Sequence, residues 1–142
     1  KTRTTKAPVM YLLDTNILID SLRRPDSPIF KHLVRLSPDE VAISTITLAE
    51  LEYGVHKSSN PSRNAQLLIE ACTPLTILPF DNGAAGTYGQ VRAHLEAQGK
   101  PIGPMDTLIA AHALSLNAIL VTNNMREFKR IKGLHLENWL RG

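Results

Sequence analysis

The chain has 142 residues, the length of one ordinary domain, and its 43% hydrophobic and 20% charged content excludes general disorder. Cys72 is the single cysteine, which excludes a disulfide framework and a cysteine-based zinc site and favours a reducing, cytoplasmic compartment. Apolar runs such as residues 9–13 and 118–121 are too short to span a bilayer, so we expect no membrane segment.

The formal charge of +3 arises at the start of the chain. Lys1, Arg3 and Lys6 meet no acid before Met10, whereas residues from Met10 onward contain 13 basic and 13 acidic side chains. The net charge is therefore no evidence for nucleic-acid binding. We expect residues 1–9 to be a disordered leader or a cloning remnant, and residues 10–142 to form a single domain.

Short apolar strands alternate with helical patterns after Met10, which is typical of α/β architecture. The predicted strands cover residues 9–13, 41–44, 75–78, 118–122 and, at one edge, 134–140. Strands joined by crossover helices are parallel. The sequence therefore predicts an α/β fold with a parallel sheet of four to five strands flanked by helices.

Proline, glycine and capping residues bound the predicted helices, with Gly99 as a left-handed cap. These helices cover residues 17–24, a segment after Ser27-Pro28, 45–56, a segment that starts at Pro61, 83–98 and 104–116, with a short turn near 125–130. The buried stripe of the second helix is predicted to comprise Phe30, Leu33, Val34 and Leu36.

Three acids occupy positions that can meet at one edge of such a sheet. Asp14 follows the first strand, Glu50 lies early in the helix after the second, and Asp106 lies in the first turn of the helix that starts at Pro104. Open parallel sheets bind ligands at the carboxyl ends of their strands. Carboxylates gathered there repel one another, and a hard cation such as Mg²⁺ or Mn²⁺ removes that repulsion. The pattern indicates metal-assisted phosphodiester hydrolysis.

Each acid also has a purely structural explanation. Asp14 suits a helix N-cap, Thr47 and Glu50 match a capping box, and Asp106 suits the positive end of a helix. On its helix, Glu50 shares a face with Tyr53. Taken from the residues alone, both interpretations stay open.

Four sequence blocks resemble those of PIN-domain ribonucleases, and in particular those of the VapC toxins of bacterial type II toxin–antitoxin pairs. They are MYLLDTN at 10–16, STITLAELEYG at 44–54, GKPIGPMDTLIAAHA at 99–113 and VTNNMREF at 121–128. The resemblance implies a single PIN domain, a Mg²⁺- or Mn²⁺-dependent endoribonuclease, and a homodimer inhibited by a VapB antitoxin. It also suggests the anticodon stem-loop of initiator tRNA as the RNA substrate.

The resemblance also assigns roles to individual residues. Asp14 and Asp106 match the family's metal ligands, and Glu50 matches the third catalytic acid. Thr15, Asn16 and Thr122 match polar positions that line the same pocket, and Asn124 is expected to lie in that pocket as well.

The segment after the fourth predicted strand departs from the broader family pattern. A fourth acid commonly follows this strand, but Asn123 and Asn124 stand here. An amide carries no full negative charge, so the sequence predicts one metal ion, with Asn124 orienting water or phosphate.

A basic cluster follows in the same region, comprising Arg126, Lys129, Arg130 and Lys132. It is interpreted either as an RNA-binding rim that positions phosphates or as an ordinary solvated face. Phe128 and Trp139 could stack a base, although a C-terminal tryptophan more often covers the core. His112, two turns beyond Asp106, is expected to pack rather than to catalyse.

Three alternative functions remain at this point. A phosphatase of the haloacid-dehalogenase type needs a second acid two residues after the first, where Asn16 stands. A non-catalytic PIN fold that only binds RNA or a partner is the main alternative. A deoxyribonuclease would use the same phosphodiester chemistry.

Overall fold

The computed structural model describes residues 9–141, so the expected leader lies, but for Val9, outside the described residues. All strands run parallel in one sheet with the order β3-β2-β1-β4-β5. Their bounds are Tyr11–Leu13 for β1, Val41–Ser44 for β2, Thr76–Leu78 for β3, Ile119–Val121 for β4 and His135–Glu137 for β5. The predicted parallel α/β fold is therefore confirmed, including the fifth strand at one edge.

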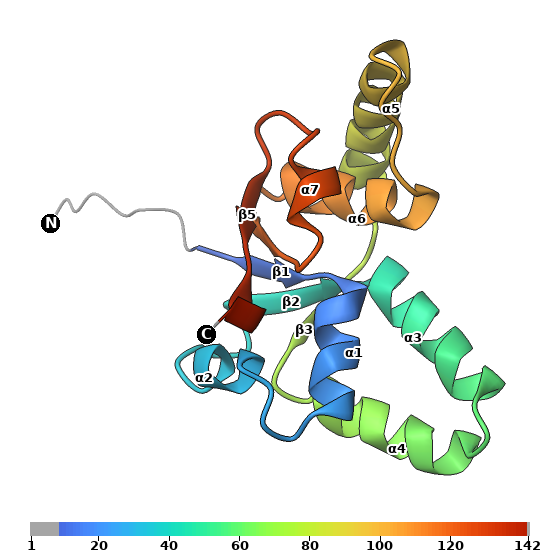
Figure 1. Ribbon diagram of the computed structural model, residues 1–142, viewed down its shortest axis with the longest axis vertical. Coiled ribbons are helices and arrows are strands. Elements are labelled where there is room, and N and C mark those ends of the chain that lie inside the picture. The colour runs from blue at the N-terminus through green and yellow to red at the C-terminus, as the bar shows by residue number, and fades with distance from the viewer. Residues whose placement is uncertain (1–8, 142) are drawn as a thin grey trace, which may run out of the picture.

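Helices cover both faces of this sheet. Figure 1 shows α1–α4 below β1 and β2, and α5–α7 above these two strands. The bounds are Thr15–Arg23 for α1, Ile29–Leu33 for α2, Thr45–Lys57 for α3, Pro61–Cys72 for α4, Asn82–Ala97 for α5, Pro104–Ser115 for α6 and Met125–Phe128 for α7. Within residues 9–141, no helix is long and apolar enough to cross a membrane.

Strand periodicity divides the core into two clusters. Successive strand residues point to opposite faces, so Leu13, Val41 and Ile43 pack toward α1, α3 and α4, while Leu12 and Ala42 pack toward α5 and α6. All five side chains are almost completely buried. Both faces are apolar because both are covered by helices, as is usual for parallel sheets.

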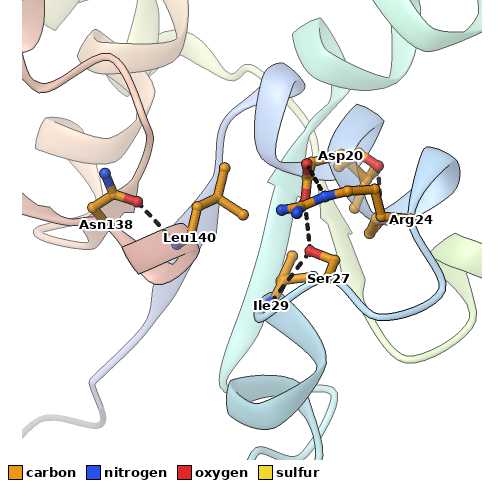
Figure 2. Close-up of polar contacts among 8 residues, drawn as sticks. Asp20, Arg24, Ser27, Ile29, Asn138 and Leu140 are labelled. Carbon is orange, nitrogen blue, oxygen red and sulfur yellow. Dashed lines mark hydrogen bonds and ion pairs between the residues drawn. The ribbon is translucent and has the colours of Figure 1, made fainter. Parts of the chain in front are cut away.

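A polar cluster links α1 to α2 (Figure 2). The carboxylate of Asp20 accepts hydrogen bonds from Arg24 Nε at 2.9 Å, from Arg24 Nη2 at 3.1 Å and from the buried hydroxyl of Ser27. The same hydroxyl accepts the backbone N–H of Ile29 at 3.4 Å. The Arg24 guanidinium holds the pKa of Asp20 below its ordinary value. Asp20 therefore fixes the connection that turns the chain from α1 into α2.

The predicted buried stripe after Pro28 is confirmed for Leu33 and Leu36 but wrong for Phe30 and Val34. Phe30 is 39% exposed and Val34 is 82% exposed, whereas Ile29 is completely buried. Ile29, Leu33 and Leu36 follow the spacing i, i+4, i+7, so these three share the face that packs on the core. α2 has only five residues, and its orientation is set by Ile29 rather than by the larger Phe30.

Candidate active site

Asp14 follows β1, where the order in which strands are added to the sheet reverses. β1 pairs with β2 on one side and with β4 on the other, and ligands of open sheets bind at such a switch point. Asp14 Oδ1 accepts the backbone N–H of Ile17 at 3.0 Å, which confirms the predicted N-cap. Asp14 Oδ2 accepts a hydrogen bond from the hydroxyl of Thr122, which follows β4. Both carboxylate oxygens are thus held in place.

The surroundings of Asp14 oppose its ionisation. The side chain is 3% exposed, and burial raises the pKa of Asp14 above its ordinary value. The hydrogen bonds from Thr122 and from the backbone of Ile17 and Asn16 act in the opposite direction, and the charge of Glu50 raises the pKa further. Positive charge in the pocket would therefore stabilise this carboxylate.

Glu50 is held from the start of α1. The hydroxyl of Thr15 donates to Glu50 Oε1 at 2.6 Å and also lies 3.3 Å from Thr47 Oγ1. The predicted capping box of Thr47 and Glu50 is wrong, because α3 begins earlier. Ser44 is its N-cap and accepts the backbone N–H of Ile46 at 3.0 Å. Glu50 is therefore one and a half turns inside α3, and its carboxylate is available to the pocket.

The pKa of Asp106 is raised by its burial and by the other acids of the site. Asp106 lies in the first turn of α6, where Pro104 starts the helix as predicted. Its pKa is raised to about 6, first by burial and then by the charges of Asp14, Glu127 and Glu50. The charges of three other carboxylates therefore act on Asp106 at the carboxyl edge of the sheet.

Asp14, Glu50 and Asp106 line a pocket of about 470 Å³. No lysine or arginine is among the described residues that line it. The lining residues are Asp14, Thr15, Asn16, Ile19, Ala49, Glu50, Tyr53, Met105 and Asp106. The structure thus brings together the three predicted acids and two of the four predicted polar residues. Thr122 lies behind the pocket and reaches it through Asp14.

Glu127 is a site residue that the sequence motifs did not indicate. It lies on α7, three residues after Asn124, and its Oε1 accepts a hydrogen bond from Asn124 Nδ2 at 2.8 Å. Its charge acts on Asp106, so it supplies a fourth negative charge near the site although Asn123 and Asn124 carry none. Its position in the short turn directly after β4 is the signal that could have identified it. The side chain of Asn124 contacts Glu127, and its expected role toward water or phosphate stays a prediction.

The basic cluster after β4 lies outside the acidic pocket. Arg126, Lys129, Arg130 and Lys132 are exposed and do not line the pocket. Arg130 Nη1 donates to the carbonyl oxygen of Pro101 at 3.0 Å, so it also ties α7 to the loop before α6.

The sequence left open that Phe128 or Trp139 stacks a base, but these residues are only 0% and 2% exposed, so neither ring is available for stacking. The alternative, that the C-terminal tryptophan covers the core, is confirmed: Trp139 belongs to the core cluster and stacks on His32. His112 is also buried, as expected, and its Nδ1 lies 2.8 Å from Ser44 Oγ.

The donor chemistry fits a divalent cation. Carboxylate and hydroxyl oxygens are the ligands of hard cations such as Mg²⁺ and Mn²⁺, and the mutual repulsion at Asp106 is what such a cation would relieve. In the described part of the chain, no three acidic, histidine or cysteine side chains lie close enough together to hold a metal ion by themselves. The acids instead line an open pocket, which is typical of a site that also admits a substrate.

The model of the PIN domain family matches residues 11–134. The chain belongs to the PIN-domain family. It is 41% identical over 129 residues to the tRNA(fMet)-specific endonuclease VapC of Shigella flexneri, covering 91% of this chain and 97% of the relative. It is 43% identical over 132 residues to ribonuclease VapC2 of Rickettsia felis, covering 92% and 98%. Within the family, the chain therefore belongs to the VapC ribonucleases.

The same relationship is visible in three dimensions. A crystal structure of VapBC2 from Rickettsia felis, bound to a DNA fragment from their promoter, contains a chain that superposes with a TM-score of 0.88. The sequence identity is 42%, and the match covers 92% of this chain and 99% of that chain. A VapC-type fold and a pairing with a VapB protein are thus typical of its relatives.

Proposed function

We propose that this chain is the toxin of a type II toxin–antitoxin pair and acts as an endoribonuclease that hydrolyses RNA phosphodiester bonds with the help of Mg²⁺ or Mn²⁺. The observation that best supports this proposal is that Asp14, Glu50 and Asp106 line one pocket, with the pKa of Asp106 raised to about 6 by burial and by the charges of Asp14, Glu127 and Glu50. A cluster of uncompensated negative charge is unfavourable unless it serves to bind a cation.

The acids have two kinds of role in this proposal. Asp14 and Asp106 would hold the cation, with Glu50 and Glu127 beside them. A bound divalent cation supplies positive charge that stabilises the phosphate during hydrolysis and lowers the pKa of water.

The chain's own hydrogen bonds orient these acids. Thr122 and the Ile17 N–H hold the two oxygens of Asp14. Thr15 holds Oε1 of Glu50, so Oε2 of that carboxylate can accept a hydrogen bond from the attacking water. This preorganisation avoids the cost of aligning the groups during the reaction.

The substrate we propose is a single-stranded RNA loop, specifically the anticodon stem-loop of initiator tRNA. The Shigella relative is named for cleavage of tRNA(fMet), and the relationship covers almost the whole of both chains. An unpaired loop can splay its nucleotides, so that a scissile phosphate can enter a pocket on the protein surface.

The decisive experiment is the digestion of total bacterial RNA with Mg²⁺, Mn²⁺ or EDTA by the wild-type protein and by Asp14→Asn. We expect discrete fragments that need the cation and disappear with the variant, and end-mapping then identifies the cleaved RNA. No cleavage by folded, antitoxin-free protein would favour the main alternative, a PIN fold that only binds RNA or a partner. Matched RNA and DNA hairpins distinguish a ribonuclease from a deoxyribonuclease.

The number of cations is a separate question. With Asn124 in place of an acid, we propose a single cation, and Asn124→Asp should then change the stoichiometry. Isothermal titration calorimetry with Mn²⁺ measures this directly. An unchanged stoichiometry would count against the proposed role of Asn124.

The basic cluster is proposed to bind RNA phosphates. Arg126→Gln and Lys129→Gln should weaken binding of an uncleaved RNA and flatten its dependence on salt, because each lost phosphate contact reduces counterion release. Arg130→Gln tests a second role as well, since Arg130 also contacts Pro101. If the salt dependence of all three variants matches the wild type, the cluster does not contact RNA.

We further propose that a VapB-type antitoxin docks in the apolar groove between α1, α3 and α4. This groove of about 290 Å³ includes Ile19, Leu51, Val55 and Leu68, and it reaches Glu50 of the acidic site. An apolar helix placed there would cover the entrance to the acids. A homodimer is proposed as well, on the resemblance to the family alone.

Two glycine substitutions test the antitoxin groove. Gly54 lines the groove and Gly86 lies on α5, and a Cβ at either position meets no heavy atom within 4 Å. We expect Gly54→Arg to abolish co-purification with the co-expressed antitoxin, while Gly86→Arg retains it. Retention by Gly54→Arg, with both variants folded, would place the antitoxin elsewhere.

A further inference from the structure

Two exposed apolar side chains lie at the acidic pocket. Among the described residues, large hydrophobic side chains are exposed at only eight positions, and Tyr53 and Met105 both line this pocket. Tyr53 is 65% exposed and Met105 is 45% exposed. Exposed apolar surface beside a functional site commonly marks a ligand contact.

The two side chains flank the acids from different helices. Tyr53 lies one turn after Glu50 on α3, and Met105 directly precedes Asp106 on α6. Lys57, one turn further along α3, places its Nζ 5.5 Å from the centroid of the Tyr53 ring. An aromatic ring and a thioether thus line the pocket of the carboxylates, and a cation lies beside that ring.

The other aromatic rings lie away from this pocket, with Phe30 on α2 and Tyr88 on α5. Trp139 packs on Tyr11 and His32, Phe80 contacts the edge of His112, and Phe128 is completely buried. Tyr53 packs on none of these rings and is the aromatic residue that lines the pocket.

We propose that Tyr53 stacks on the nucleobase next to the scissile phosphate, with Met105 on the other side of that base and Lys57 beside the flanking phosphate. This inference rests on the proposed RNA cleavage and names the residue that selects its substrate. Every base has a π-face, so stacking tolerates any base but needs an unpaired one. Tyr53 therefore selects single-stranded nucleotides at the cleavage position, while base identity is left to other contacts.

The test uses binding by a protein that cannot cleave. In the Asp14→Asn background, Tyr53→Ala, Tyr53→Phe and Tyr53→Trp are titrated with a hairpin around the cleavage site mapped in total RNA, carrying 2-aminopurine next to that site. Stacking quenches 2-aminopurine fluorescence. We expect Tyr53→Ala to abolish the quench and raise Kd by about 5- to 150-fold. Tyr53→Phe and Tyr53→Trp should keep the fluorescence quench and the wild-type Kd.

Two controls separate stacking from structural effects. Phe30→Ala removes an aromatic ring that is 39% exposed on α2, outside the pocket, and should leave Kd unchanged. An RNA without a base at the stacked position should bind wild-type and Tyr53→Ala proteins equally. Thermal unfolding monitors the fold of each variant, and Tyr53→Ala replaces an exposed residue with a good helix former.

The outcomes are distinct for the two proposals. If the wild-type protein cleaves no RNA, the proposed function fails. If it cleaves RNA and Tyr53→Ala retains the quench and the wild-type Kd, the stacking proposal alone is overturned. A loss with Tyr53→Phe as large as with Tyr53→Ala would also overturn it, because the hydroxyl and not the ring would then make the contact.

Discussion

Burial and repulsion from the neighbouring carboxylates destabilise the ionised form of Asp106. Its pKa is about 6 in the fold and ordinarily 3.8, so the native state binds a proton more tightly than the unfolded chain. Stability therefore falls as pH rises from about 4 to about 6. We expect Asp106→Asn to stabilise the cation-free protein by about 1–2 kcal/mol at pH 8, a value reduced for solvent screening, and to have little effect at pH 4.

Urea unfolding in EDTA at several pH values measures this difference. Glu52→Gln is the matched control, because it removes an exposed carboxylate of α3 that does not line the pocket. A stability of Asp106→Asn that equals the wild type at pH 8 would show that the acids do not repel one another as the structure indicates.

His112 has the opposite dependence on pH. Burial lowers the pKa of this imidazole below its ordinary value of 6.5, so the fold favours the neutral form. As pH falls below about 6.5, the unfolded chain takes up the proton first, and this contribution to stability is lost. His112→Ala should flatten this part of the pH profile and cost about 2–4 kcal/mol through lost packing and the lost contact with Ser44.

Urea unfolding between pH 5 and pH 8 checks the role of His112, with the exposed His94→Ala as the control. Because His112 lies on the helix of Asp106 and Ser44 caps the helix of Glu50, the contact also joins the two helices that hold these acids. If the free energy of unfolding of His112→Ala depends on pH in the same way as that of the wild type, the titration of His112 does not contribute to stability.

At the scale of elements, the connection between α1 and α2 depends on Asp20. Asp20→Ala would remove the hydrogen-bond acceptor of Arg24 and of the buried Ser27 hydroxyl. We expect a loss of about 1 kcal/mol, since the ion pair is largely solvated but the Ser27 hydroxyl loses its acceptor. Denaturant unfolding measures this, and Arg24→Ala alone should cost less. Equal losses would mean that the ion pair, and not Ser27, stabilises the connection.

Local signals predicted the elements where a single residue sets the backbone. Pro61 and Pro104 begin α4 and α6, and Gly99 follows α5 with a positive φ of 67°, as predicted for a left-handed cap. β5 is shorter than expected because Asn138 ends it: its Oδ1 accepts the backbone N–H of Leu140 at 2.9 Å, and a 3₁₀-helix follows (Figure 2). Such side-chain to backbone bonds compete with strand pairing and carry no periodic signal.

At the scale of the whole molecule, cation binding should stabilise the fold in a pH-dependent way. Mg²⁺ at a concentration 100 times its Kd would add about 2.7 kcal/mol. Below pH 6 protons compete at Asp106, so the gain should shrink. Thermal unfolding with Mg²⁺ or EDTA at pH 5 and pH 8 tests this. An equal gain at both pH values, or a full gain with Asp14→Asn, would place the cation outside the acidic pocket.

The sequence by itself determined the parallel α/β fold and the helices that start at Pro61 and Pro104, because apolar periodicity and turn residues act within a few positions of the chain. It also identified three acids through their motifs. Only the tertiary structure decided which polar groups meet. Thr122 bonds to Asp14 across 108 positions and Thr15 to Glu50 across 35, while Glu127 joins the site through its charge. The physical reason is that parallel strands bring distant segments to one edge, where side-chain directions depend on neighbours from other elements.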